Sequence, residues 1–192
     1  PTLVIGGSGF VGEYFLYMSH RSHRLQQYLA PTHAELDITR RDSVLKYFLK
    51  LKPRYVINFA AYTNMDESEK ERNQKDKKTW KTNYIGAKNI VRACRACNTF
   101  CIQISTDAVF PGTDEYPGPY CESDAQQKNG KGLNWYGYTK LKAEEEVKTL
   151  GKKFAIIRIS HPFGNPQSER DLAKKTLRDI QAGHRLFADQ LF

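Results

Sequence analysis

The run Val4-Ile5-Gly6-Gly7-Ser8-Gly9-Phe10-Val11-Gly12 decides the fold of this chain. It starts in a short apolar segment, which is typical of a buried strand, and leads into an amphipathic segment with helical spacing. Gly6, Gly9 and Gly12 have the spacing G-x-x-G-x-x-G. In such a turn the first glycine permits the tight bend, the second lets the main chain approach a pyrophosphate, and the third lets the helix pack on the strand. The N–H groups at the helix start attract phosphate. The context predicts a dinucleotide site, and the alternative is a purely structural turn.

The rest of the chain alternates short, nearly continuous apolar runs with longer helical segments. Strands are expected at 3–5, 25–29, 55–59, 101–105 and 154–159. Helices are expected at 11–19, 41–51, 139–150 and 169–182, with a long one ending in 80–97. Strand–helix alternation of this kind predicts βαβ units in a parallel sheet. We therefore expect an α/β, Rossmann-like, doubly wound parallel sheet with helices on both faces.

Composition and charge limit the class of protein. The chain has 192 residues and a net charge of +9, from 30 Lys and Arg against 21 Asp and Glu. No apolar run approaches the roughly 18 residues of a membrane span, and no signal peptide is recognised, so we expect a cytoplasmic protein without membrane contact. Bases are mixed with acids, as in 66–81, where five acids face six bases. That mixture is typical of a solvated face, and we expect no nucleic-acid partner.

The four cysteines favour reduced thiols over a disulfide framework. Cys94, Cys97 and Cys101 are spaced like metal ligands, but a four-ligand zinc site lacks its last member nearby. We expect no metal, and we expect these thiols to pack as small apolar groups.

The choice between NAD and NADP depends on the end of the second strand. NAD enzymes often carry an acid there, about 20 residues after the glycines. The expected strand ends in Leu29-Ala30-Pro31-Thr32, which contains no acid. The basic cluster at 20–24 precedes the strand and so is expected at the opposite edge of the sheet. The missing acid removes an argument against NADP(H) without supplying a positive one, and we expect NADP(H) or NAD(H), with NADP(H) slightly favoured.

Tyr136 and Lys140 form a Tyr-x-x-x-Lys pair at the start of an expected helix. Residues four apart share a helix face, where an ammonium group can assist proton donation by a phenol. A second register pairs Tyr138 with Lys142. The first pair lies on the apolar stripe of the helix, whereas the second lies on the far side. We therefore predict that Tyr136 and Lys140 point toward the sheet and that Tyr138 and Lys142 point to water.

The fourth expected strand ends in Ser105-Thr106-Asp107. Ligands of open α/β sheets bind beyond the carboxyl ends of strands, so Thr106 could hydrogen-bond a substrate carbonyl near Tyr136. The alternative is that these residues cap the next turn. Residues 111–135 follow without apolar periodicity, and a loop of that length is expected to be a lid or binding loop.

With these motifs in order, the chain resembles the extended short-chain dehydrogenase/reductases, and most closely the dTDP-4-dehydrorhamnose reductase family. The matching stretches are Glu35–Thr39, Val56–Thr63, Ile104–Phe110 and Leu133–Gly137, besides the glycine turn. The resemblance implies an NAD(P)H-dependent reductase of a 4-keto-6-deoxy nucleotide sugar, with Tyr136 as proton donor to the sugar and hydride from nicotinamide. A homodimer is the assembly that it suggests.

The resemblance also carries over site residues. Thr106, Asp107, Tyr136 and Lys140 would be catalytic. The cofactor would contact Gly6, Ser8, Gly9, Phe10, Val11, Gly12, Asp37, Ile38, Phe59, Ala60, Ala61, Tyr62, Ser105, Tyr136 and Lys140. The substrate would contact Thr106, Asp107, Val109, Phe110, Tyr136 and His161.

The chain departs from the family pattern at two positions near these residues. Ala108 stands where the family usually has Tyr, and His161 stands where it usually has Trp. Residues 1–192 would form the NAD(P)-binding domain, with the substrate-binding region starting at about 161 and most of that lobe lying beyond Phe192. Two alternatives remain open: an NADP-binding regulatory subunit of the methionine adenosyltransferase β type, and a nucleotide-sugar epimerase or dehydratase.

Overall fold

A five-stranded parallel sheet forms the centre of the computed structural model, which describes residues 1–22, 28–126, 130–165, 168–169 and 171–183. The strands are β1 (Thr2–Ile5), β2 (Tyr28–Leu29), β3 (Tyr55–Asn58), β4 (Phe100–Thr106) and β5 (Phe154–Ile159). Their order is β2-β1-β3-β4-β5, and every neighbouring pair is parallel. The chain leaves β1 toward β2 on one side and returns to β3 on the other, so the carboxyl end of β1 is a topological switch point. The predicted Rossmann-like parallel sheet is confirmed.

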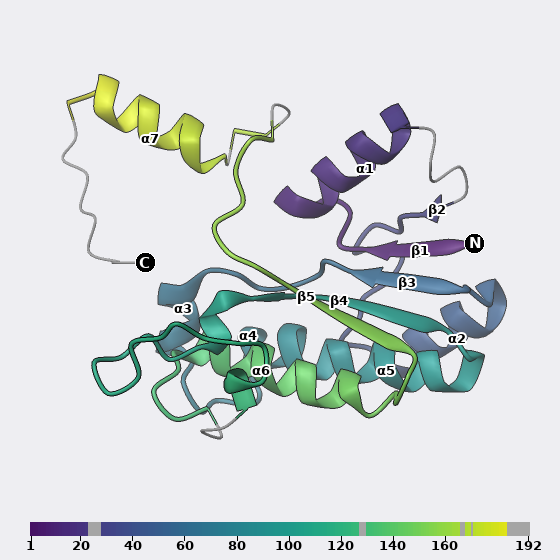
Figure 1. The fold of residues 1–192 in the computed structure, drawn as a ribbon. Helices are drawn as coiled ribbons and strands as arrows, with labels where there is room; N and C mark the ends of the chain where they lie inside the picture. The colour runs from purple at the N-terminus through teal and green to yellow at the C-terminus, as the bar shows by residue number, and fades with distance from the viewer. Residues whose placement is uncertain (23–27, 127–129, 166–167, 170, 184–192) are drawn as a thin grey trace.

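Helices lie on both faces of this sheet (Figure 1). One face carries α1 (Phe10–Ser22), and the other carries α2 (Arg41–Leu51), α5 (Gly86–Cys97) and α6 (Trp135–Lys148). The main core lies between the sheet and the second group of helices. Its fully buried members include Leu3, Val44, Phe48, Val56 and Ile90.

The long helix expected to end in 80–97 is present, as continuous helical backbone from α4 (Lys78–Trp80) through a π-helical turn at Lys81–Ile85 into α5. A separate short helix, α3 (Met65–Lys70), precedes it. Asn64 caps α3 through its side chain, and Asn73 adopts a positive φ of 65° between α3 and α4. Because α3 ends at Lys70 and α4 begins only at Lys78, the charged segment at 66–81 is not one helix.

Two other helices differ from their expected bounds. The helix with the Tyr-x-x-x-Lys pair was expected at 139–150 but starts at Trp135, because the Asn134 side chain accepts the Gly137 N–H at 2.7 Å and so caps it. The last helix, α7, spans Leu172–Gln181, and the Asp171 side chain caps it. The expected second strand at 25–29 is described only at 28–29, as β2. Residues 111–126 form the predicted long loop, with one short 3₁₀ turn at Asp124–Gln126.

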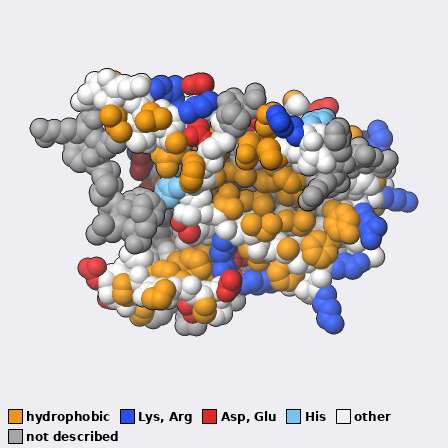
Figure 2. Space-filling view, turned by 45° about the horizontal axis from the view of Figure 1, so that its top comes forward, with side chains coloured by type: hydrophobic (Ala, Val, Ile, Leu, Met, Phe, Trp, Pro, Cys, Tyr) orange, Lys and Arg blue, Asp and Glu red, His pale blue; other side chains and the backbone are white. Residues whose placement is uncertain are grey.

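After β5 the chain leaves the sheet, and α7 lies on the side of α1 (Figure 1). Leu172, Leu177 and Ile180 of α7 are exposed, as is Ile157 of β5. Figure 2 shows a broad hydrophobic area on the side that carries α1 and α7. The proposed start of a second region near residue 161 coincides with the departure from the sheet. No helix in the described part of the chain is long and apolar enough to cross a bilayer.

Candidate active site

The glycine turn joins β1 to α1 in a conformation that excludes larger side chains. Gly6 has a φ of +78°, and a Cβ on it would lie 2.5 Å from the Ala60 nitrogen. A Cβ on Gly12 would lie 2.3 Å from the Gly6 oxygen, which itself accepts the Gly9 N–H at 3.0 Å. Ser8 is exposed at the tip of this turn, and Phe10 and Val11 begin α1. The first N–H groups of α1 therefore lie at the carboxyl edge of the sheet, where a helix start attracts phosphate.

Residues 59–62 run beside this turn, directly after β3. The Phe59 N–H donates to Ile5 O at 2.9 Å, and the Ala60 N–H donates to the Asn58 side chain at 3.1 Å. Farther along, the Tyr62 N–H donates to Asn83 Oδ1 at 2.7 Å, and Asn83 Nδ2 donates to Tyr62 O at 3.1 Å. The strip predicted to line the cofactor is thus held through its main chain.

Asp37 and Ile38, which the resemblance places at the adenine, have different environments. Asp37 is half-buried, and its Oδ1 accepts both the N–H and the hydroxyl of Thr39, at 2.9 and 2.7 Å. Burial raises the pKa of this carboxyl, but the Thr39 hydrogen bonds outweigh it and the net shift is downward. Ile38 is buried in the main core against Gly86 of α5.

Tyr136, Thr106 and Lys140 lie together where β4 ends and α6 begins. Thr106 lies close enough to the Tyr136 phenol to lower its pKa, and Lys140 Nζ donates to Ile104 O at 2.7 Å. Both α6 residues are buried, with Tyr136 9% and Lys140 4% exposed. The predicted inward orientation of this pair is confirmed. The alternative that Thr106 caps the next turn also holds, since its hydroxyl accepts the Ala108 N–H at 3.1 Å and caps a 3₁₀ turn at Asp107–Val109.

Burial shifts the pKa values of both residues. It lowers the pKa of Lys140 to about 8, although the negative charge of Glu144 opposes the shift. It raises the pKa of the Tyr136 phenol, an effect that the Thr106 hydrogen bond opposes and the charge of Asp107 reinforces. A phenol with a raised pKa stays protonated at neutral pH, as a proton donor must.

Asp107 links the ends of β4 and β5. Ser160 Oγ donates to Asp107 Oδ2 at 2.6 Å and lies 3.3 Å from Nδ1 of His161. Thr106 Oγ1 also lies 3.0 Å from Asp107 Oδ1. His161 is therefore near Thr106 and Asp107, at the edge where a substrate was predicted.

The remaining predicted contacts lie behind that edge. Ser105 is 3% exposed and its hydroxyl donates to Glu144 at 2.5 Å. Val109 is fully buried in a small cluster with Ala125, Leu133 and Leu141, so its side chain is a core residue. Phe110 is half-buried and stacks on Tyr120, with 4.8 Å between ring centroids.

Tyr138 and Lys142 differ in part from the prediction that both point to water. Tyr138 is half-buried, because its ring stacks on Trp135 at 5.4 Å and on Trp80 at 6.4 Å. Lys142 is half-buried too and pairs with Glu145 at 2.7 Å. The long loop and α4 cover this side of α6, which the periodicity of the sequence could not show.

The sequence did not single out Asn83 or Gly137. Asn83 Nδ2 also donates to Thr139 Oγ1 at 3.0 Å, so this buried amide connects the strip at 59–62 to α6. A Cβ on Gly137 would lie 2.0 Å from Ala108 O, so only glycine lets α6 approach the end of β4. The signal for Gly137 was its place inside a helix, where glycine is unfavourable. For Asn83 there was no local signal.

The cysteines take the structural role expected of them. The thiols of Cys94 and Cys101 are buried in the main core, and Cys97 packs against it. Burial and a hydrogen bond with Cys101 raise the pKa of the Cys94 thiol. Among the described residues, no group of three His, Cys, Asp or Glu side chains could hold a metal ion.

The site therefore combines a glycine turn at a helix start with a buried Tyr–Lys pair and a threonine hydroxyl. A Cβ on Gly9 would meet the protein only at Gly6 O, 3.2 Å away, so the main chain at Gly9 is open on its outer side and fits a dinucleotide pyrophosphate, which only a bare main chain can approach so closely.

Comparison with known proteins places this chain in a family. The family model of the RmlD substrate binding domain matches residues 1–191. The dTDP-4-dehydrorhamnose reductase of Aggregatibacter actinomycetemcomitans is 32% identical over 84% of this chain and 51% of its own length. A crystal structure of this reductase from Clostridium acetobutylicum has a TM-score of 0.78 and 31% identity over 95% of this chain and 60% of the other. The Bacillus anthracis reductase, solved with NADP, has a TM-score of 0.74 and 26% identity over 96% of this chain and 60% of the other.

The chain thus spans about half the length of the curated relative. The match of the family model over almost all of its residues nevertheless shows that the chain belongs to the RmlD substrate binding domain family.

Proposed function

We propose that this chain is the cofactor-binding and proton-donating part of an NADP(H)-dependent reductase of a 4-keto-6-deoxy nucleotide sugar. The observation that carries the proposal is the buried Tyr136 phenol, beside Thr106 and one helical turn before Lys140, at the same sheet edge as the glycine turn. The NADP complex of a 26% identical relative supports the cofactor. NAD(H) remains the alternative to be tested by titration.

The residues divide the reaction between them. NADPH, when bound, supplies the hydride to the keto carbon. Thr106 donates a hydrogen bond that polarises the keto oxygen, and Tyr136 transfers its phenolic proton to that oxygen as the alcohol forms. Lys140 holds the cofactor ribose and stabilises the tyrosinate that remains. The first N–H groups of α1 and the main chain at 59–62 orient the cofactor, and His161 and Phe110 contact the sugar.

A paired experiment tests the division between cofactor and sugar. The 192-residue chain and a version extended to the length of its relatives are titrated with NADPH and NADH, and NADPH oxidation by a 4-keto-6-deoxy nucleotide sugar is followed. We expect both to bind NADPH and only the extended protein to turn over well, because loss of substrate orientation is costly, on the order of 7–11 kcal/mol in model systems. Absence of NADPH and NADH binding below millimolar concentration in both would contradict the proposal.

A regulatory, cofactor-binding role is the second candidate. Its support is the replacement of the family's usual Trp by His161 and the engagement of the Asp107 carboxylate by Ser160. This candidate predicts NADPH binding by the extended protein with no reduction of any 4-keto nucleotide sugar. An epimerase or dehydratase would convert the sugar without net NADPH oxidation.

A further inference from the structure

A buried ion pair joins α6 to β5 beneath the candidate site. Glu144 is fully buried, and its two carboxylate oxygens accept from Arg158 Nε at 2.9 Å and from a second guanidinium nitrogen at 2.7 Å. The Arg158 side chain is only 15% exposed. Both residues interrupt apolar patterns, one on the inward stripe of α6 and the other in the strand sequence Phe-Ala-Ile-Ile-Arg-Ile.

This pair is attached to the residues of the site. Glu144 lies one helical turn after Lys140, and its Oε1 also accepts the hydroxyl of Ser105, the residue before Thr106. Desolvation makes a buried pair a poor device for stability, because apolar residues of similar volume do as well. A bidentate pair between a guanidinium and a carboxylate does fix the orientation of both side chains. The arrangement therefore favours a role for the ion pair in positioning neighbouring residues over a role in stability.

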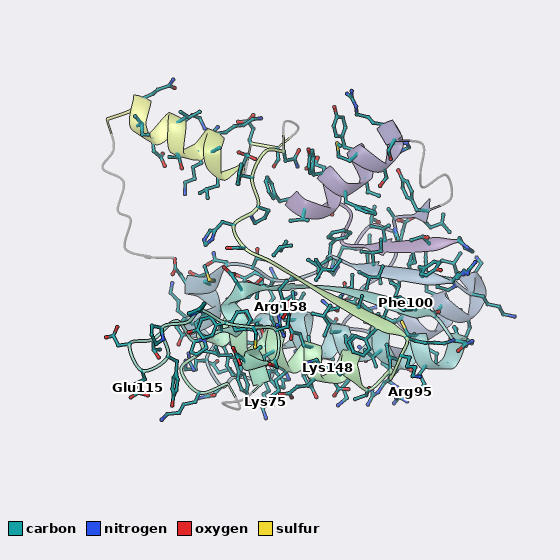
Figure 3. All side chains as sticks on the ribbon, in the orientation of Figure 1. Lys75, Arg95, Phe100, Glu115, Lys148 and Arg158 are labelled. Atoms are coloured by element: carbon teal, nitrogen blue, oxygen red, sulfur yellow. The ribbon has the colours of Figure 1, made fainter. Side chains whose placement is uncertain are left out.

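The third nitrogen of the Arg158 guanidinium contacts the long loop. Its remaining terminal nitrogen donates to Glu122 O at 2.8 Å, and the guanidinium lies over the Phe110 ring, 5.1 Å from the centroid. Phe110 in turn stacks on Tyr120, whose hydroxyl accepts the Gly112 N–H at 2.9 Å. Figure 3 shows Arg158 between β5 and α6, with Glu115 of the loop farther out at the carboxyl end of the sheet.

We propose that Arg158, anchored by Glu144, is a positioning residue that fixes Phe110 and the loop at 111–126 at the mouth of the site and so sets affinity for the sugar. The inference rests on the proposed function for its substrate. Arg158 forms these hydrogen bonds with α6 and the loop, and none of them, within the described residues, involves the glycine turn or the strip at 59–62. Cofactor binding should therefore not depend on it.

Arg158→Lys is the test. Lysine keeps the positive charge beside Glu144, but its single ammonium cannot hydrogen-bond both the Glu144 carboxylate and Glu122 O while also lying over the Phe110 ring. Amide hydrogen exchange is measured without substrate in the 192-residue chain. We expect exchange within 111–126 to quicken about tenfold, the factor for one lost charged hydrogen bond, while exchange in α5 stays unchanged. In the extended protein we expect the KM for the sugar to rise about tenfold, with kcat and NADPH affinity within about twofold.

Lys88→Met is the matched control. It removes a partially exposed ion pair between Lys88 of α5 and Glu146, which lies on α6 like Glu144 but away from the loop. It should change neither loop exchange nor KM. If Arg158→Lys fails to fold, Glu144→Gln with Arg158→Gln removes both charges of the pair. This double variant also removes the carboxylate that acts on Lys140, so only loop exchange is measured in it, and the same loop-specific change is expected.

A uniform rise in exchange over the whole chain, or loop exchange equal to that of the unmodified protein, would overturn the proposal. A fall in kcat and in NADPH affinity that accompanies the rise in KM would also overturn it. Lack of turnover by the unmodified extended protein would count against the reductase alone, because loop exchange is measured without substrate and decides the role of Arg158 separately.

Discussion

The two halves of the candidate site are built differently. The half around β1, α1 and the end of β3 presents main chain, since it depends on glycines at positions where a Cβ would collide with Gly6 O or Ala60 N. The half around β4, β5 and α6 presents side chains, joined through Ser105, Glu144 and Arg158. A main-chain site depends on local conformation, whereas a side-chain site depends on which elements become neighbours.

This difference predicts which property, cofactor binding or the reaction, a substitution in each half should change. Changes in the glycine turn should act on the cofactor, and changes on α6 should act on the reaction. Asn83 bonds to both halves and should affect both.

Tyr136→Phe should produce the largest effect and would test the second half alone. Loss of the proton donor should reduce turnover of the extended protein by about 10²–10⁴-fold, with NADPH affinity nearly unchanged. Steady-state kinetics and fluorescence titration measure the two quantities. Tyr138→Phe is the matched control, and because it keeps the ring that stacks on Trp135, it should be close to neutral. Equal losses from both substitutions would contradict the assignment of Tyr136.

Gly12→Ala should affect the first half. The new Cβ would lie 2.3 Å from Gly6 O, so the strand–helix contact must open, at a cost of about 1–3 kcal/mol in the free energy of unfolding. NADPH affinity should fall at least about tenfold. Gly9→Ala is the comparison, because its Cβ meets protein only at 3.2 Å, from Gly6 O. It should leave stability nearly intact and weaken NADPH binding by its approach to the phosphates.

Asn83→Ala would sharpen the comparison by cutting the connection between the halves. It removes hydrogen bonds to the Tyr62 main chain and to Thr139, and should cost about 2 kcal/mol in the free energy of unfolding. NADPH affinity and kcat should both fall. Thr99→Val, which removes a buried bond to Pro53 O at the opposite edge of the sheet, should cost stability without changing either. An effect of Asn83→Ala on stability alone would show that the halves are independent.

The pH dependence of stability tests the burial of Lys140 in the second half of the site. Lys140 titrates at about 8 in the folded chain, against an ordinary value of 10.5. Between these values the unfolded chain binds more protons, so this residue makes the free energy of unfolding rise with pH, by at most about 1.4 kcal/mol per pH unit. Denaturant unfolding from pH 7.5 to 10 should show that Lys140→Met removes this rise. Lys142→Met should not, because pairing with Glu145 outweighs burial and raises the pKa of Lys142.

Much of the fold could be predicted from the sequence because its signals are local. The glycine turn, the apolar strands and the punctuation between them predicted a parallel sheet, and the bounds of β5 and α2 agree with the expected ones. The inward face of α6 followed from helical periodicity, since Tyr136 and Lys140 share a stripe with apolar residues. The break in the charged segment at 66–81 was missed because that segment contains no Gly or Pro to mark the turn between α3 and α4.

The sequence by itself determined the parallel sheet, the glycine turn at its first helix, and the inward Tyr136–Lys140 pair, because periods of two and 3.6 residues and bare glycines act within a few positions. Only the tertiary structure decided that Asn83 bonds to Tyr62 and Thr139, that Tyr138 joins Trp80 and Trp135 in one aromatic cluster, and that Arg158 joins Glu144 to a loop 36 residues away. Each of these contacts forms between elements distant in the chain, and their side chains meet only because the sheet order places β4 beside β5, with α6 packed against both. The free energy of such contacts depends on that placement, which no local pattern in the sequence specifies.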